Sequence, residues 1–229
     1  MTQFNIVFLV YPDVVQLDVM AAYQVLAFPP NTKIFLLWKN LEPVVSSEGL
    51  IIIPTTTLDH CPNLDIICVP GGGMGQIEVM KDGDILNFLK QQSATAKYIT
   101  SVCTGSLILA AANLLQGYQA TCHWALQEQL VLFGVEVVQE RVVIDRDRIT
   151  GAGVTSGIDV GLTLLALLCG EDTAKMAQLM MEYDPKPPFN AGTPEAAGKE
   201  VVEPLLELGR PLIEAFATQT QEMMLQTKL

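Results

Sequence analysis

The residue best suited to covalent chemistry is Cys103, within the stretch SVCTGS at residues 101–106. The apolar run Tyr98–Val102 predicts a buried strand that ends at this thiol, and the spacing of Thr104–Leu115 predicts a helix that begins directly after it. A helix N-terminus stabilises a thiolate, so the stretch has the pattern of a nucleophile elbow with sulfur in place of oxygen. The alternative is a buried core cysteine, which is the usual fate of a free thiol.

A glycine loop, Gly71 to Gly73, follows Pro70 at the end of the apolar run Leu64–Val69. Parallel strands that are buried on both faces have such runs, so this strand is expected to end at the same edge of the sheet as the thiol. There, the amides of Gly72 and Gly73 could bind charge that develops on a substrate. The spacing matches neither a dinucleotide fingerprint nor a P-loop. An ordinary strand-ending turn is the alternative.

Two further polar residues stand in apolar surroundings. Asp18 lies in the first predicted helix and is either a helix cap or an acid with a raised pKa. His123 follows a short predicted strand and could assist a thiolate or make a structural hydrogen bond. The adjacent pairs at 60–61 and 122–123 (His-Cys and Cys-His) lack the ligand spacing of a zinc site, so we expect no metal.

The elements that must position these residues alternate along the chain. Strands are predicted at 5–10, 32–38, 64–69, 98–102 and 119–121, with hairpins at 44–53 and 142–149. Helices are predicted at 17–26, 85–92, 104–115, 125–133, 155–168, 173–181 and 200–225, the last interrupted by Gly209 and Pro211, after a Pro/Gly loop at 184–192. The alternation predicts an α/β fold with a doubly wound, mostly parallel sheet flanked by helices on both faces.

The composition limits the classes of partner. A chain of 229 residues, half of them apolar, fits one domain over residues 1–229. Its 13 basic and 25 acidic residues give a net charge of -12, which predicts no nucleic-acid and no membrane partner. No apolar run reaches the ~18 residues of a membrane span, and no signal-peptide pattern is present. Five cysteines without a CxxC pair predict reduced thiols in a cytoplasmic protein.

Together these features resemble the PfpI-type branch of the class I glutamine amidotransferase-like superfamily, in which a strand, an acid on the first helix, a PGGG loop and a cysteine elbow follow one another. The similarity covers nearly the whole chain. Within that branch, further stretches resemble the isonitrile hydratases: YPD at 11–13 with Asp18, SVCTGS at 101–106, HW at 123–124, GAGVTSGID at 151–159 and PPFNAG at 187–192.

The resemblance implies a flavodoxin-like sheet, Cys103 as nucleophile and Asp18 as the acid hydrogen-bonded to it. Thr104 matches the residue after the nucleophile and is expected at the substrate. The implied reaction hydrates an isonitrile, R–N≡C, to an N-substituted formamide through a thioimidate on the cysteine, with no cofactor. PfpI-type peptidases have His in place of Thr104, and many relatives have Glu in place of Asp18; both departures disfavour peptidase and deglycase activity.

The resemblance also implies a homodimer, and apolar residues of the terminal helix, Leu205, Leu212 and Phe216, are compatible with one. Two other functions stay open: a glyoxalase- or deglycase-like hydrolase that uses Cys103 with His123, and a redox-sensing thiol protein without turnover. A transcription regulator is disfavoured because the terminal helix is acidic and offers no basic recognition segment.

Overall fold

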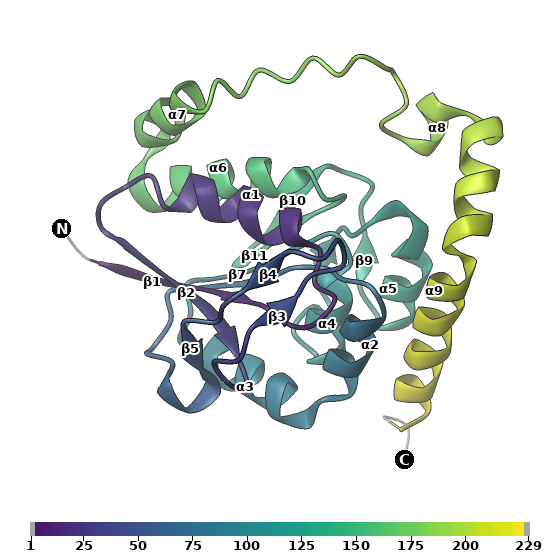
Figure 1. The fold of residues 1–229 in the computed structure, drawn as a ribbon, viewed down its shortest axis with the longest axis horizontal. Coiled ribbons are helices and arrows are strands. Elements are labelled where there is room, and N and C mark those ends of the chain that lie inside the picture. The colour runs from purple at the N-terminus through teal and green to yellow at the C-terminus, as the bar shows by residue number, and fades with distance from the viewer. Residues whose placement is uncertain (1–2, 227–229) are drawn as a thin grey trace.

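A computed structural model of the chain describes residues 3–226, and its centre is a mostly parallel sheet (Figure 1). Within these residues the sheet has seven strands in the order β10-β11-β7-β6-β1-β2-β5. All neighbours are parallel except β10 and β11, which form an antiparallel hairpin. The strands are β1 (Phe4–Leu9), β2 (Thr32–Trp38), β5 (Thr56–Thr57), β6 (Ile66–Val69), β7 (Tyr98–Val102), β10 (Val142–Asp145) and β11 (Arg148–Gly151). The predicted α/β class is confirmed.

Two small sheets complete the strand structure of the described residues. β3 (Val44–Val45) and β4 (Ile51–Ile52) form the predicted hairpin, and β8 (Gln119–Ala120) pairs in parallel with β9 (Glu136–Val137). Every residue of β6 is buried, as a central parallel strand requires.

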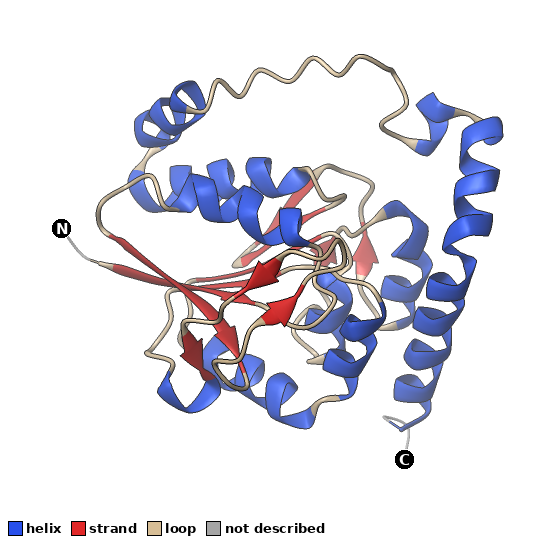
Figure 2. Ribbon diagram, viewed as in Figure 1, coloured by secondary structure: helices blue, strands red, loops and turns tan. Residues whose placement is uncertain are grey.

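Helices cover both faces of the sheet, as Figure 2 shows. α1 and α6 pack against each other on one face with α7 beyond them, whereas α2 to α5 lie on the other face with α9 outside them. The helices are α1 (Gln16–Leu26), η1 (Leu58–His60), α2 (Met74–Lys81), α3 (Gly83–Ser93), α4 (Gly105–Ala111), η2 (Trp124–Leu126), α5 (Gln127–Leu132), α6 (Ser156–Cys169), α7 (Glu171–Met180), α8 (Pro194–Ala197) and α9 (Lys199–Gln226).

Several helices differ from the sequence prediction, among them α8 (Pro194–Ala197) and η1, which were not predicted. α2 was not predicted because its first residues, Met74 and Gly75, continue a glycine-rich stretch. α4 ends at Ala111, short of the predicted 115. The interruption of the last helix is wrong: α9 continues through Pro204 and Pro211. Each proline lacks the backbone N–H that would donate one helical hydrogen bond. The helix nevertheless continues beyond Pro211, where Phe216, Gln219 and Thr220 are buried.

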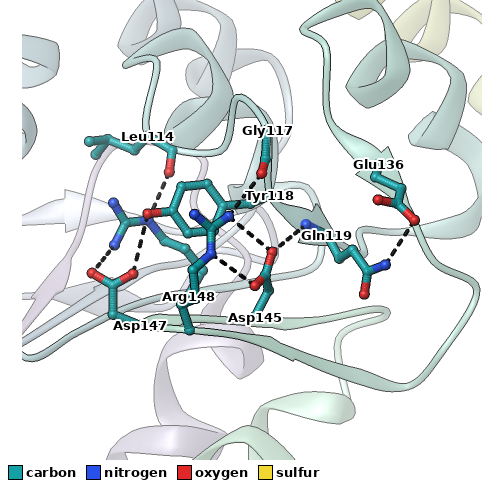
Figure 3. Close-up of polar contacts among 9 residues, drawn as sticks. Leu114, Gly117, Tyr118, Gln119, Glu136, Asp145, Asp147 and Arg148 are labelled. Carbon is teal, nitrogen blue, oxygen red and sulfur yellow. Dashed lines mark hydrogen bonds and ion pairs between the residues drawn. The ribbon is translucent and has the colours of Figure 1, made fainter.

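A polar cluster fixes β8 against the β10–β11 hairpin (Figure 3). The Asp145 carboxylate accepts the Gln119 amide at 2.8 Å, and the Arg148 guanidinium donates to the Leu114 carbonyl at 2.7 Å. The Tyr118 ring packs under the Arg148 guanidinium, and the distance from the guanidinium carbon to the ring centroid is 4.7 Å. Because β8 leads directly into residues 121–124, this cluster sets where the predicted histidine lies.

Candidate active site

Cys103 occupies the predicted junction, between the end of β7 and the start of α4. Its φ of 59° is left-handed, which is uncommon for a residue with a side chain and typical of strained functional positions. Gly105 allows the turn to close on β6, because a Cβ there would lie 2.1 Å from the Val69 carbonyl oxygen. The turn is also fixed by the Ser106 hydroxyl, which donates to the Thr121 carbonyl at 2.6 Å.

Asp18 lies inside the first turn of α1 and is almost completely buried. The residue at the N-cap position is Val15, so the interpretation of Asp18 as a helix cap is wrong. Its Oδ2 accepts the Gly71 amide at 2.9 Å, whereas Oδ1 is buried and has no partner of ordinary hydrogen-bond geometry among the described residues. The free oxygen is available to the Cys103 thiol, whose interaction with Asp18 alters the pKa of both groups.

Burial governs the protonation of this pair. Desolvation raises the pKa of Asp18 to about 7, against the lowering effect of hydrogen bonds from Gly71 and Cys103. Desolvation, and then the charge of Asp18, raises the pKa of the Cys103 thiol well above its usual value, although the Thr104 amide favours the thiolate. Burial therefore opposes the expected stabilisation of the thiolate by the helix N-terminus, because desolvation disfavours the charged form.

The glycine loop lies beside the elbow, but its amides are already engaged. The Gly72 amide donates to Gln76 Oε1 at 2.8 Å and lies 3.2 Å from Thr104 Oγ1, and the Gly73 amide donates to the Asp13 carbonyl at 2.9 Å. The predicted oxyanion role of Gly72 and Gly73 conflicts with these bonds. The Thr104 amide, which faces the Cys103 sulfur, is the donor better placed for that role.

Gln76 is a site residue that sequence reasoning missed. It is completely buried, and its Nε2 donates to the Thr104 carbonyl at 2.7 Å while its Oε1 accepts the Thr104 hydroxyl at 2.6 Å. The same oxygen accepts the Gly72 amide, so one side chain joins the elbow to the glycine loop. The sequence shows a glutamine in a helix that was itself not predicted, and no pattern distinguishes it from a surface residue.

Tyr11 was also missed as part of the site. It is completely buried, and its hydroxyl donates to the Pro70 carbonyl at 2.9 Å, which fixes the start of the glycine loop. Burial, followed by the charges of Asp18 and Cys103, raises the pKa of Tyr11 well above its usual value, so the phenol stays neutral. The only signal in the sequence was its place in the YPD stretch at 11–13.

His123 contacts the elbow with its backbone and not with its imidazole ring. Its amide donates to the Cys103 carbonyl at 3.3 Å, while its Nδ1 accepts the Ala125 amide at 3.4 Å and caps η2. Burial lowers the pKa of the imidazole, which favours the neutral form. The structural interpretation of His123 therefore fits these contacts better than assistance to a thiolate. Among residues 3–226, no three His, Cys, Asp or Glu side chains form a group that could hold a metal ion.

Fold and site together define a class of protein, and residues 5–167 match the DJ-1/PfpI family. The chain belongs to the DJ-1/PfpI family. It is 49% identical over 208 residues to an isonitrile hydratase of Pseudomonas putida, with 90% of each chain covered. A crystal structure of a THiJ/PfpI family protein from Pseudomonas syringae superposes with a TM-score of 0.93 at 43% identity, covering 96% of this chain and 91% of that one.

A transcription regulator, GbdR of Pseudomonas aeruginosa, matches over a smaller part. It is 33% identical over 145 residues, which cover 62% of this chain and 38% of the regulator. The similarity is therefore confined to one part of that longer protein. None of the helices described between residues 3 and 226 combines the length and apolar character needed to cross a membrane.

Proposed function

We propose that this chain is an isonitrile hydratase, which converts R–N≡C and water into the formamide R–NH–CHO. The observation that carries the proposal is the burial of Cys103 beside Asp18, which raises the pKa of the carboxyl to about 7 and that of the thiol well above its usual value. An isonitrile carbon must accept both a nucleophile and a proton, and this pair supplies both. The identity of 49% with a protein that carries this activity supports the assignment.

In the first step the sulfur of Cys103 attacks the terminal carbon of the isonitrile. Asp18 in its ionised form takes the thiol proton and transfers it to that carbon, so the S–H bond breaks while an S–C and a C–H bond form. The product is a thioimidate, R–N=CH–S–Cys. The Thr104 amide, which faces the sulfur, is placed to stabilise charge that develops during attack.

In the second step water adds to the thioimidate carbon. Asp18 removes a proton from the water, and the nitrogen gains one, which gives R–NH–CH(OH)–S–Cys. Collapse then breaks the C–S bond, returns the hydroxyl proton to sulfur through Asp18 and releases R–NH–CHO. Each proton passes through the same carboxyl group, whose pKa of about 7 suits both giving and accepting a proton near neutrality.

The contacts favour hydration over the two other functions. A hydrolase that uses Cys103 with His123 needs the imidazole at the thiol, but the imidazole Nδ1 is bonded to Ala125 in its own loop. A redox-sensing thiol needs thiolate and exposure, whereas Cys103 is buried and the pKa of its thiol is raised.

The test of the proposed function is formamide detection by mass spectrometry after incubation with cyclohexyl isonitrile. We expect turnover from the wild type and none from Cys103→Ala or Cys103→Ser, both folded by circular dichroism, because neither supplies the sulfur nucleophile. Cys68→Ala is the matched control, since Cys68 is equally buried in β6 and takes no part in the reaction. Substantial hydration by folded Cys103→Ala would disprove the assignment of the nucleophile.

Three broader features belong to the same proposal. We take residues 1–229 as one domain, supported by a hydrophobic core that runs from Ile6 in β1 to Phe216 in α9; residues 1–2 and 227–229 lie outside the described part. The cytoplasm is the proposed location, since all five cysteines are free. The proposed substrate is a small isonitrile.

The proposed assembly is a homodimer, but the residues expected to form its interface are revised. Phe216 is buried and Leu212 packs against the chain's own core, so neither is available to a partner. Large apolar side chains that are exposed instead include Leu205 and Leu208 on α9 and Leu179 on α7, of which the last two are about four-fifths exposed. A second copy of the chain that covered these side chains would remove their apolar surface from water.

A further inference from the structure

The side-chain amide of Gln76 is completely buried, and both of its ends are hydrogen-bonded. Oε1 accepts the Gly72 amide at 2.8 Å and the Thr104 hydroxyl at 2.6 Å, and Nε2 donates to the Thr104 carbonyl at 2.7 Å. A backbone N–H can only donate and a carbonyl can only accept, so these partners fix which end of the amide is the oxygen. The site therefore needs one acceptor and one donor at these two places.

Thr104 is held by Gln76 at two of its atoms. Because Oε1 carries no proton, the Thr104 hydroxyl must donate its own proton to it, and the hydroxyl oxygen lies 3.2 Å from the Gly72 amide. The Thr104 carbonyl is held by the other end of the same glutamine. The amide of Thr104 is the group that faces the Cys103 sulfur, so its orientation depends on these bonds.

The glycine loop connects Gln76 to the other half of the reacting pair. Gly72 is bonded to Gln76, and the amide of the preceding residue, Gly71, donates to Asp18 Oδ2 at 2.9 Å. A Cβ on Gly71 would lie 2.8 Å from the Thr104 nitrogen and 2.9 Å from Asp18 Oδ2, so the loop, the elbow and the acid meet in close contact. A displacement of the loop at Gly72 would therefore move the donor that holds Asp18.

We propose that Gln76 is a positioning residue for isonitrile hydration, which holds the Thr104 amide at the Cys103 sulfur and the Gly71 amide at the Asp18 carboxyl. The inference rests on the proposed function and adds to it a residue that acts through Thr104 and the glycine loop. Misplacement of reacting groups by ~1 Å can cost ~10²-fold in rate, so loss of this support is expected to lower kcat strongly.

The first test replaces Gln76 by an apolar side chain of similar length. Gln76→Met leaves the Gly72 amide and the Thr104 carbonyl without this partner, and we expect kcat for cyclohexyl isonitrile to fall ~10²-fold while KM changes by less than about threefold. Gln129→Met is the matched control, since Gln129 is a buried glutamine on α5, and it is expected to change neither value. A kcat within about threefold of the wild type in folded Gln76→Met would overturn the proposal.

The second test uses Gln76→Glu, because a protonated carboxyl has the same shape and supplies the same acceptor and donor. Burial and nearby negative charge favour the protonated form of the introduced carboxyl. The titratable groups around this position are Asp13, Asp18 and Cys103 toward the elbow, and Glu78, Lys81 and Glu222 in the groove between α2 and α9.

At about pH 6 we therefore expect kcat of Gln76→Glu to exceed that of Gln76→Met by at least about tenfold, and the advantage to shrink as the introduced carboxyl ionises at higher pH. An ionised carboxylate has no proton to donate to the Thr104 carbonyl. Rates are divided by the folded fraction measured by circular dichroism at each pH, so a change in stability alone does not alter them. Equal rates of the two variants at about pH 6 would overturn the proposal.

Crystal structures of the wild type and of Gln76→Met give a measurement that does not depend on turnover. We expect the Thr104 peptide and Gly72 to move away from the Cys103 sulfur and the Asp18 carboxyl in the variant, and unchanged positions would overturn the proposal. If Gln76→Met does not fold, Gln76→Glu compared with the wild type supplies both the rates and the structure. A wild type that forms no formamide would refute the hydratase assignment alone, and the structures would still decide whether Gln76 holds the pair.

Discussion

At the scale of single residues, the important property of the site is that one carboxyl and one thiol share a buried space. Burial raises the pKa of both groups, and the charge of Asp18 raises that of the Cys103 thiol further, whereas the hydrogen bond from Cys103 lowers the pKa of Asp18. A fully ionised pair would place two negative charges together in a medium of low dielectric. Near neutral pH the pair therefore keeps one proton, which is the proton that the first step of isonitrile hydration consumes.

The first prediction at this scale concerns the identity of the acid. Asp18→Asn keeps an oxygen for the Gly71 amide but can neither accept nor return a proton, so we expect a ~10²–10⁴-fold loss of rate in the folded variant. Asp18→Glu keeps the acid but extends it by one methylene in a crowded site, and is expected to be impaired yet measurable. Single-turnover kinetics are the measurement. Wild-type rates from Asp18→Asn would remove Asp18 from the mechanism.

The second prediction is a pH profile. The attack needs Asp18 ionised and Cys103 protonated, and the pKa of Asp18 is about 7 whereas that of the thiol is raised well above its usual value. The value of kcat/KM is therefore expected to fall about tenfold per unit below about pH 6 and to level off above about pH 8. Initial rates in buffers from about pH 5.5 to 9 would show this. A flat profile across that range would contradict the raised pKa.

The sequence singled out the two residues proposed to react, but not the residues that hold them. Cys103 and Asp18 stood out because a thiol at a strand end and an acid among apolar neighbours are unusual, and the structure places them side by side. Gln76 and Tyr11 were missed because their importance depends on burial against segments distant in the sequence: Gln76 bonds to Thr104, 28 residues away, and Tyr11 to Pro70, 59 residues away. No local pattern encodes such contacts.

At the scale of elements, the close approach of two neighbouring strand ends forms the elbow. β6 and β7 are paired in parallel, and the turn after β7 packs directly on the end of β6. The strand prediction for 98–102 coincided with β7 because apolar residues between polar segments mark a buried strand. The ends of α4 and the existence of α2 were harder to predict, since tertiary contacts such as those of Gln76 decide them.

A prediction at this scale tests the close approach at Gly105. A Cβ there would lie 2.1 Å from the Val69 carbonyl oxygen, so Gly105→Ala is expected to destabilise the fold by about 1–3 kcal/mol and to reduce hydration by displacing Cys103. Gly83→Ala is the matched control, since Gly83 begins α3 and has no heavy atom within 4 Å of an added Cβ. It is expected to be neutral or slightly stabilising. Urea denaturation would measure both, and equal midpoints would contradict the prediction.

At the scale of the whole molecule, the C-terminal half of α9 is anchored and the other half is not. Phe216, Gln219 and Thr220 are buried against the body, whereas the first turns of α9 carry exposed apolar side chains beyond it (Figure 1). The segment between α7 and α8 is an extended loop that runs along the top of the view in Figure 1, above α1 and α6.

The prediction at this scale is that the chain is a homodimer that uses this exposed surface. Light scattering at micromolar concentration is expected to give twice the chain mass of 24.9 kDa. Leu208→Glu, at an exposed position, is expected to shift the population toward monomer because it places charge in an apolar contact. Glu207→Gln, the adjacent exposed position, is the control and is expected to leave the mass unchanged. A monomeric wild type would refute the proposed dimer.

The continuity of α9 through both prolines has a mechanical consequence. α9 packs against α2, which starts at the glycine loop, and against η2, which starts after His123. α9 is one helix from Lys199 to Gln226, although each proline leaves one helical hydrogen bond unmade. Because α9 contacts both α2 and η2, a neighbouring molecule that displaced this helix would act on the elements that begin beside the glycine loop and beside His123.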